Sequence, residues 1–297
     1  MKILLTGCHG QVGWELARSL LPLGELICAN RSQADFMDLP ALRVFIQQQA
    51  PDVIVNAAAY TAVDKAETES ARAFLINAEA TAVLAEEAKK KGALLIHYST
   101  DYVFDGTKDS PYTEMDTPHP LNVYGQSKLS GETAIQVIRA DHLILRTSWV
   151  YAARSQNFLN TILRLASERE QLNIVADQIG APTWARLIAE TTAHMLKQSM
   201  LERHYGYFNS AIYHLSAGGS TSWYDFARTI VNYAHRQVNP GIKNCVIKPI
   251  PAIDYPLPAR RPANSRLLCE RLENKFGLRM PTWESALALC MEEKLGA

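Results

Sequence analysis

The stretch MKILLTGCHGQVGWELARSL, residues 1–20, decides the fold. It opens with the short apolar run KILLT, and Gly7, Gly10 and Gly13 follow at intervals of three. Residues 14–21 then carry apolar side chains at helical spacing. A strand, a glycine-rich turn and a helix in this order form the dinucleotide-binding corner of a doubly wound sheet, where a diphosphate lies at the helix N-terminus. A plain strand-to-helix turn in another α/β protein is the alternative.

Length, charge and cysteine content narrow the class of protein. The chain has 297 residues, room for one large domain or for one domain and a smaller lobe. Lys plus Arg and Asp plus Glu both number 30, so nothing in the charge favours nucleic acid or an anionic membrane. The five cysteines form no CxxC pair, which fits a reducing cytosol. With no signal peptide and no apolar run near the roughly 20 residues of a membrane span, we expect a cytoplasmic protein.

Apolar runs and helical patterns alternate over the first half of the chain, as in the βαβ units of a parallel sheet. The strands expected there are residues 25–29, 52–58, 93–99 and 142–148, and the expected helices are residues 40–49, 71–91 and 124–139. We therefore predict an α/β fold with a doubly wound parallel sheet of the Rossmann type over residues 1–151. A smaller, mainly substrate-binding C-terminal lobe is expected over residues 152–297.

The alternation is less regular beyond residue 151. Residues 239–264 hold most of the later prolines and are expected to be irregular. Residues 213–236 are expected to return to the Rossmann sheet. The elements predicted for this half are strands at 172–176 and 213–216 and helices at 158–169, 185–197, 223–236, 265–276 and 283–295.

Tyr124 and Lys128 are four residues apart on a predicted helix, hence on one face. An unperturbed phenol has a pKa of about 10, and a nearby ammonium lowers that pKa by favouring the phenolate. The pair suits acid–base chemistry at a carbonyl or hydroxyl, although a solvated helix face has the same spacing. Thr100 ends an apolar strand, where ligands of such sheets bind, so its hydroxyl is expected to bind a substrate oxygen. A turn cluster is the alternative for Thr100.

These features together resemble the extended, nucleotide-sugar branch of the short-chain dehydrogenase/reductase superfamily. The matching parts are the glycine loop, the strand end NAAA at residues 56–59, Thr100, Tyr124 and Lys128. The closer resemblance, over nearly the whole chain, is to the dTDP-4-dehydrorhamnose reductase family. It is carried by GCHGQVGWEL (7–16), DVIVNAAAYTAVDKAE (52–67), HYSTDYVFDG (97–106), PLNVYGQSKLSGE (120–132), RTSWVYA (146–152), DQIGAPTWA (177–185), YHLSAGG (213–219) and RPANSRL (261–267).

The resemblance implies a reductase that transfers hydride from NADPH or NADH to the C4 keto group of a dTDP-sugar, in the synthesis of dTDP-rhamnose for polysaccharides. It implies that Tyr124 protonates the C4 alkoxide, that Lys128 holds the nicotinamide ribose and tunes Tyr124, and that Thr100 positions the keto oxygen. For Phe104 and Trp149 core packing is the alternative. The implied substrate-binding residues are Thr100, Asp101, Tyr102, Phe104, Trp149, Asn157, Gln178 and Arg261.

The end of the second strand bears on the choice of cofactor. NAD-preferring folds place a carboxylate there for the ribose 2′-hydroxyl, whereas this chain has Asn30 and Arg31. We therefore predict that NADPH is accepted, and NADH remains an alternative. The implied cofactor-binding residues are Gly7, His9, Gly10, Gln11, Val12, Gly13, Asn30, Arg31, Asp35, Phe36, Ala57, Ala58, Ala59, Tyr60, Ser99, Tyr124 and Lys128.

Some members of the family form a dimer bridged by a metal that glutamates hold. Glu15 and Glu292 match two of these carboxylates, but Arg186 stands where the middle one belongs, and a cation there opposes Mg²⁺. We therefore do not expect Mg²⁺ or the bridged dimer, although Glu15 and Glu292 are the candidate ligands, and solvated helix surface is the alternative for both. The chain is expected to be a monomer or a homodimer.

Three other functions stay open: another 4-keto-sugar reductase, an epimerase and a non-catalytic regulatory subunit. Related dehydratases carry an acidic pair directly after the serine or threonine, whereas Thr100 is followed by Asp101 and Tyr102, which argues against a dehydratase. Another 4-keto-sugar reductase or an epimerase also fits the Tyr–Lys pair. A non-catalytic regulatory subunit, as of methionine adenosyltransferase, is the alternative of another class, and the intact Thr100, Tyr124 and Lys128 oppose it.

Overall fold

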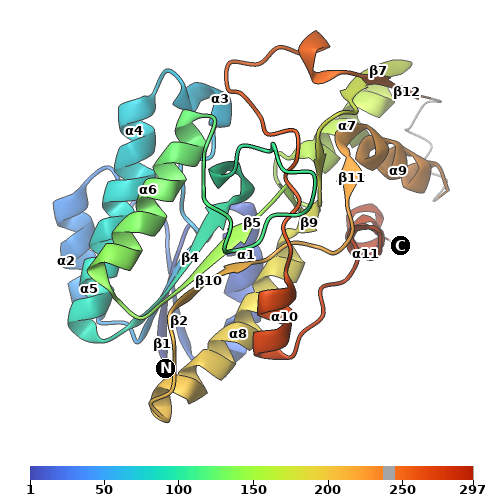
Figure 1. Ribbon diagram of the computed structural model, residues 1–297. Coiled ribbons are helices and arrows are strands. Elements are labelled where there is room, and N and C mark those ends of the chain that lie inside the picture. The colour runs from blue at the N-terminus through green and yellow to red at the C-terminus, as the bar shows by residue number, and fades with distance from the viewer. Residues whose placement is uncertain (237–244, 297) are drawn as a thin grey trace.

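The computed structural model describes residues 1–236 and 245–296 and is built around a six-stranded sheet (Figure 1). The strand order is β10-β5-β4-β3-β1-β2, and every pairing is parallel. The order reverses between β1 and β3, and ligands of such sheets bind outside the carboxyl ends of the strands at that point. The strands are β1 (Lys2–Thr6), β2 (Glu25–Ala29), β3 (Val53–Asn56), β4 (Leu94–Thr100), β5 (His142–Thr147) and β10 (Ala211–His214). The predicted α/β fold with a doubly wound parallel sheet is confirmed.

Helices cover both faces of this sheet, which explains why its strands are continuous apolar runs. Ile3 and Leu5 of β1 lie in the core beneath α1 (Gln11–Ser19) and α8 (Ala185–His204). Leu4 between them points to the opposite core. The helices over that opposite face are α2 (Leu39–Gln49), α5 (Ala80–Lys91) and α6 (Val123–Ile138).

The helix predicted over residues 71–91 is interrupted. It consists of α4 (Ser70–Phe74), a π-helical turn η2 (Leu75–Glu79) and α5, and it ends at Gly92, which has φ of +64°. π turns are often found at functional sites, and this one carries Asn77, which contacts the loop after β3 and the helix α6. The Asn77 side chain accepts a hydrogen bond from the Tyr60 backbone N–H and donates to the Ser127 hydroxyl of α6.

A second apolar core lies in the C-terminal half, between α7 (Phe158–Glu168), α9 (Trp223–Arg236) and α11 (Trp283–Leu295). Beside it, β7 (Gln171–Val175) pairs with β12 (Val246–Ile250). The expectation of an irregular stretch over residues 239–264 is wrong for β12, while residues 239–244 lie outside the described part. Pro249 lies within β12, which among the described residues pairs only with β7, and such edge strands tolerate proline.

The segment 213–236 is divided between the two cores. Strand β10 extends the main sheet beside β5, whereas α9 packs in the second core. The helix predicted over 265–276 is shorter in the structure, because only α10 (Glu270–Phe276) is helical. The boundary at residue 151 stays a prediction. The remaining elements are η1 (Leu21–Leu23), α3 (Val63–Ala66), η3 (Asp101–Val103), β6 (Val150–Tyr151), β8 (Ile179–Gly180), β9 (Thr183–Trp184), β11 (Thr221–Ser222) and η4 (Ala252–Asp254).

Candidate active site

A cavity of about 770 Å³ opens at the carboxyl ends of the parallel strands, where the fold predicts a ligand. Most of the predicted cofactor residues and four of the predicted substrate residues line it. These are Gly7, His9, Gly10, Gln11, Val12, Asn30, Arg31, Asp35, Phe36, Ala57, Ala58, Ala59, Ser99, Thr100, Asp101, Tyr102, Tyr124, Lys128 and Trp149. The structure thus brings together residues from the first glycine turn to the helix α6.

The glycine loop allows close backbone packing at one end of the cavity. Gly7 has φ of +72°, and a Cβ there would lie 2.6 Å from the backbone of Ala57. A Cβ on Gly13 would lie 2.1 Å from the Gly7 carbonyl oxygen, so Gly13 is needed for packing although it does not line the cavity. Helix α1 begins directly after Gly10, and no side chain of the described residues caps it. Its free N–H groups therefore suit an anion.

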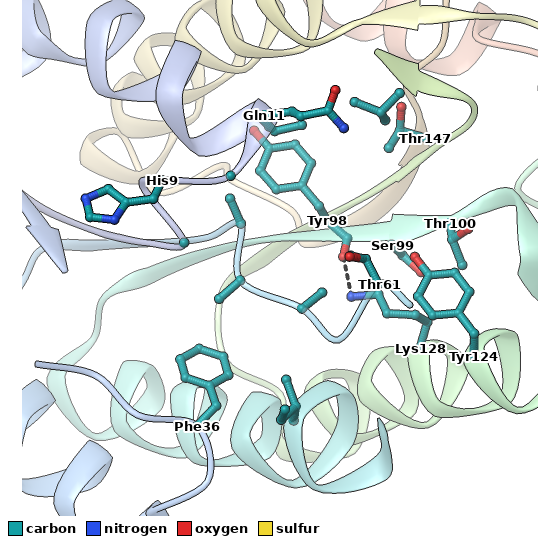
Figure 2. Close-up of a pocket in the computed structure, with 18 of the residues that line it drawn as sticks. His9, Gln11, Phe36, Thr61, Tyr98, Ser99, Thr100, Tyr124, Lys128 and Thr147 are labelled. Carbon is teal, nitrogen blue, oxygen red and sulfur yellow. Dashed lines mark hydrogen bonds between the residues drawn. The ribbon is translucent and has the colours of Figure 1, made fainter. Parts of the chain in front are cut away.

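Tyr124 and Lys128 project from α6 toward the end of β4, where Ser99 and Thr100 lie (Figure 2). Asn122 caps α6 by accepting a hydrogen bond from the Gly125 N–H at 2.8 Å, which fixes the start of the helix at Val123. Helical spacing then places both side chains on the cavity face. Thr100 Oγ1 donates to Asp101 Oδ1 at 3.2 Å.

The pKa of Tyr124 differs from the expectation drawn from the sequence. Burial raises the pKa of Tyr124 to about 12, the neighbouring Thr100 hydroxyl opposes the rise, and the charge of Asp101 adds to it. Lys128 does not lower it in this structure, because Nζ donates to the Tyr98 carbonyl at 2.6 Å and lies 3.1 Å from His97 Nε2. Tyr124 is therefore a protonated phenol at neutral pH. It can donate a proton to a basic oxygen.

Asp101 and Tyr102 form the wall next to Tyr124. Burial raises the pKa of the Asp101 carboxyl to about 7, and Oδ2 has no hydrogen-bond partner among the described residues. The Tyr102 ring meets the Tyr124 ring edge to face, with centroids 5.9 Å apart. Arg261 lowers the pKa of Tyr102 against a larger rise caused by burial. Arg261 itself pairs with Asp64 at 2.9 Å and stands behind this wall, outside the cavity lining.

Two tryptophans, Trp149 and Trp223, also line the cavity. Trp149 has φ of +47° and stacks on Trp223, with ring centroids 3.5 Å apart. Gly180 lies against the Trp149 indole, since a Cβ there would approach the ring to 2.5 Å. Sequence reasoning missed Trp223, because it contacts Trp149 in the fold but lies far from it in the sequence, and no local pattern links the two residues. The other lining residues that were missed are Ala29, Ala34, Thr61, Val63, Ile76, Tyr98, Thr147, Val150, Ser155 and Gln156.

Four further predicted residues do not line the cavity. Phe104 is buried, with its ring stacked 4.2 Å from Tyr112, so the structure places it in a packed core. Asn157 caps α7 and donates to Gln11 Oε1 at 3.0 Å, which joins α7 to the glycine loop. The Tyr60 hydroxyl donates a hydrogen bond to the Glu69 carboxylate. Gln178 is half-buried and lies just before β8.

The predicted metal residues do not converge, and the expectation of solvated surface is wrong for Glu15, which is buried. Arg186 lies 3.2 Å from Glu15 and 3.0 Å from Glu293, while Glu292 accepts from the Tyr233 hydroxyl at 3.4 Å. Across residues 1–236 and 245–296 no three His, Cys, Asp or Glu side chains are grouped so as to hold a metal ion. Whether the chain binds Mg²⁺ stays a prediction. None of the helices in these two ranges is long and apolar enough to cross a membrane.

Comparisons with known proteins give a consistent result. The model of the RmlD substrate binding domain matches residues 1–295. The chain is 53% identical over 298 residues to the dTDP-4-dehydrorhamnose reductase of Burkholderia thailandensis, covering 99% of both chains. It is 46% identical over 297 residues to the enzyme of the same name from Escherichia coli K12, covering 99% of this chain and 98% of the relative. A crystal structure of dTDP-4-dehydrorhamnose reductase from Bacillus anthracis in complex with NADP is similar with a TM-score of 0.88 at 33% identity, covering 99% of this chain and 100% of that one.

Proposed function

The chain belongs to the RmlD substrate binding domain family, and from this premise we propose that it reduces the C4 keto group of dTDP-4-dehydro-L-rhamnose to give dTDP-L-rhamnose. It is an NAD(P)H-dependent oxidoreductase. The observation that carries the proposal is the meeting of a phenol, a lysine and a threonine with the open N-terminus of α1 on one cavity.

The cavity residues fit a nicotinamide dinucleotide. The uncapped N-terminus of α1 suits the diphosphate. Ser99 and Thr147 line the cavity, and Ser99 Oγ and Thr147 Oγ1 find no hydrogen-bond partner among the described residues. A bound ligand is the partner that we propose for these two hydroxyls. When bound, the reduced cofactor supplies the hydride that the keto carbon receives.

Tyr124 supplies the proton. Its phenol is neutral because burial raises its pKa to about 12, and the oxygen of a ketone gains basicity as hydride reaches the carbon. Thr100 stands beside this phenol and holds the keto oxygen in line with it. Lys128 faces the same cavity and holds the nicotinamide ribose. The tyrosine that has lost its proton is then reprotonated from solvent.

The sugar and its diphosphate bind in the part of the cavity that Asp101, Tyr102 and Trp149 line. The unpartnered Asp101 Oδ2 is an acceptor for a sugar hydroxyl. Arg261 lies next to Tyr102, and its planar donors suit a diphosphate oxygen once its pairing with Asp64 loosens. Asn157 and Gln178 reach the nucleotide end of the substrate only if the loops carrying them close over the cavity.

NADPH is the cofactor that the end of β2 favours. Arg31 and Asn30 line the cavity there, and the only carboxylate nearby in the lining, Asp35, lies 3.8 Å from the Arg31 guanidinium. An arginine next to the adenosine ribose favours a 2′-phosphate. We propose that the chain works in the cytoplasm as a monomer or a homodimer.

Supplying 4-keto-6-deoxy dTDP-sugars with NADPH tests the reaction, with the absorbance of the reduced cofactor as the measurement. We expect oxidation that requires the C3/C5-epimerised sugar. Oxidation with the un-epimerised sugar alone identifies a different 4-keto reductase. Absence of oxidation with either sugar contradicts a reductase of this class.

A further inference from the structure

His97, in the middle of β4, is a buried titratable residue that the proposed reaction does not use. Its ring is fully buried. Nδ1 lies 3.0 Å from Asn56 Nδ2, and Nε2 lies 3.1 Å from Lys128 Nζ. The ring therefore connects the carboxyl end of β3 to the lysine of the cavity.

The Asn56 amide determines which ring nitrogen carries the hydrogen. Asn56 Oδ1 accepts from the Thr6 hydroxyl at 2.8 Å and from the Ala58 backbone N–H at 3.2 Å. A hydroxyl can donate or accept, but a backbone N–H only donates, so the Ala58 contact requires oxygen on that side. The amide NH₂ then faces His97, and Nδ1 must accept its hydrogen bond.

A neutral imidazole whose Nδ1 is an acceptor carries its hydrogen on Nε2. That N–H points at Lys128 Nζ. An amine can accept it through a lone pair, whereas an ammonium has none and faces it N–H against N–H. Burial and the neighbouring Lys128 and His142 lower the pKa of His97 well below its usual value, so the ring stays neutral.

We propose that His97 is a positioning residue for Lys128, holding Nζ against the Tyr98 carbonyl and making Lys128 give up its proton more readily than an ordinary lysine. The inference rests on the proposed function only in assigning Lys128 to the cofactor. A lysine tuned in this way can gain or lose a proton as ligands enter the cavity.

Charged residues on the neighbouring elements also act on the pKa of Lys128, but they do not account for a lowered value. Glu132, one turn along α6, favours the ammonium, but its carboxylate also accepts two bonds from Arg146 of β5, at 2.9 Å and 2.6 Å. Burial outweighs Glu132 and lowers the pKa of Lys128 to about 8. The other titratable groups on β4, η3, α6 and β5 near this cluster include Tyr98, Asp101, Tyr102, Tyr124 and His142.

The tautomer can be read directly in the wild-type protein without ligands. Long-range ¹H–¹⁵N spectra distinguish a protonated from an unprotonated ring nitrogen. We expect the Nε2–H tautomer of His97 from mildly acidic to mildly basic pH. An Nδ1–H tautomer or an imidazolium overturns the inference, and this measurement does not depend on any variant folding.

A variant tests the effect on the lysine. His97→Asn keeps an acceptor for Asn56 near the Nδ1 position and removes the Nε2–H. Titration of the Lys128 Cε resonance in protein with ¹³C-labelled lysine, assigned by its loss in Lys128→Met, gives the pKa of Lys128. We expect His97→Asn to raise that pKa by about one unit. An unchanged pKa overturns the inference.

His142→Asn is the matched control, since it replaces a second buried histidine, on the neighbouring strand β5, that bonds the Ala140 carbonyl. It should leave the pKa of Lys128 where it is in the wild type, and an equal rise in both variants contradicts the specific role of His97. Failure of this inference leaves turnover of the wild-type protein intact. Failure of the proposed function appears as absent turnover whatever the tautomer of His97.

Discussion

The indole planes of Trp149 and Trp223 lie face to face, 3.5 Å apart between centroids and inclined by 8°. The two residues come from different parts of the fold, one after β5 and the other at the first residue of α9. Both line the cavity, so the stack joins the end of β5 to the second core at the cavity.

Replacing Trp223 should weaken sugar binding more than cofactor binding. An aromatic pair contributes about 0.5–1.5 kcal/mol beyond its buried area, so we expect Trp223→Ala to raise KM for the sugar by roughly 3- to 10-fold. Trp223→Phe keeps a ring for Trp149 and should recover most of this loss. Steady-state kinetics with each substrate varied in turn check the prediction, and an equal rise of KM for NADPH contradicts it.

Tyr124→Phe should lose turnover while keeping the cofactor. The ring and its packing against Tyr102 remain, and only the proton donor is removed. General acid catalysis contributes about 10²- to 10⁴-fold, so kcat should fall by that range. Fluorescence titration with NADPH should give an unchanged Kd. A variant with near-full kcat shows that another group supplies the proton.

Asp101 should make stability fall as pH rises through the neutral range. Its folded pKa of about 7 is raised, so the folded state holds a proton that the unfolded state releases above about pH 4. The stabilisation by this proton is present at low pH and is lost progressively between these two values. Asp101→Asn should remove that slope, a difference on the order of a few kcal/mol between pH 5 and pH 8 in urea unfolding.

Asp116→Asn is the control of opposite sign. Hydrogen bonds from Lys108 and Thr113 lower the pKa of Asp116 to about 2. Its contribution to stability is therefore present above about pH 4 and lost as pH falls through the folded value. The two variants should tilt the pH profile of unfolding in opposite directions, and parallel profiles contradict the assignment of Asp101.

Arg31→Ala should reduce the preference for NADPH over NADH. The Arg31 side chain is 70% exposed and paired only loosely with Asp35, so it is free to turn toward a 2′-phosphate. A hydrogen bond to a charged group contributes about 1.5–3 kcal/mol, so the ratio of kcat/KM values for the two cofactors should change at least about tenfold. Lys65→Ala is a control on a charged surface residue outside the cavity lining. An unchanged ratio in Arg31→Ala removes Arg31 from cofactor selection.

Local patterns predicted the first half of the fold well. The strand, the glycine turn and a helix after it follow from spacing alone, although the predicted helix spans residues 14–21 and α1 spans Gln11–Ser19. Strand β2 was predicted with its exact bounds. The π turn at residues 75–79 could not be predicted, because it depends on Asn77 meeting Tyr60 and Ser127. Strand β12 was missed because the stretch around it is rich in proline, which is typical of loops, and because its pairing with β7 is distant in sequence.

The candidate site shows the same contrast between local patterns, which could be predicted, and contacts distant in sequence, which could not. Thr100, Tyr124 and Lys128 were found through a strand end and a helical spacing, and the structure brings them to one cavity. The effect of Lys128 on the pKa of Tyr124 was predicted less well. Burial raises that pKa, and Lys128 Nζ donates its hydrogen bond to the Tyr98 carbonyl instead. Trp223 and His97 act through contacts that no sequence pattern contains.

Asn77 has a mechanical consequence for the whole site. Its single amide spans two backbone atoms of residue 60, at 2.8 Å and 3.1 Å, and the Ser127 hydroxyl at 2.9 Å. Asn77 thereby holds the loop after β3 at a fixed distance from α6, the helix that carries Tyr124. A ligand that displaces this loop would therefore move the Tyr124 phenol with it.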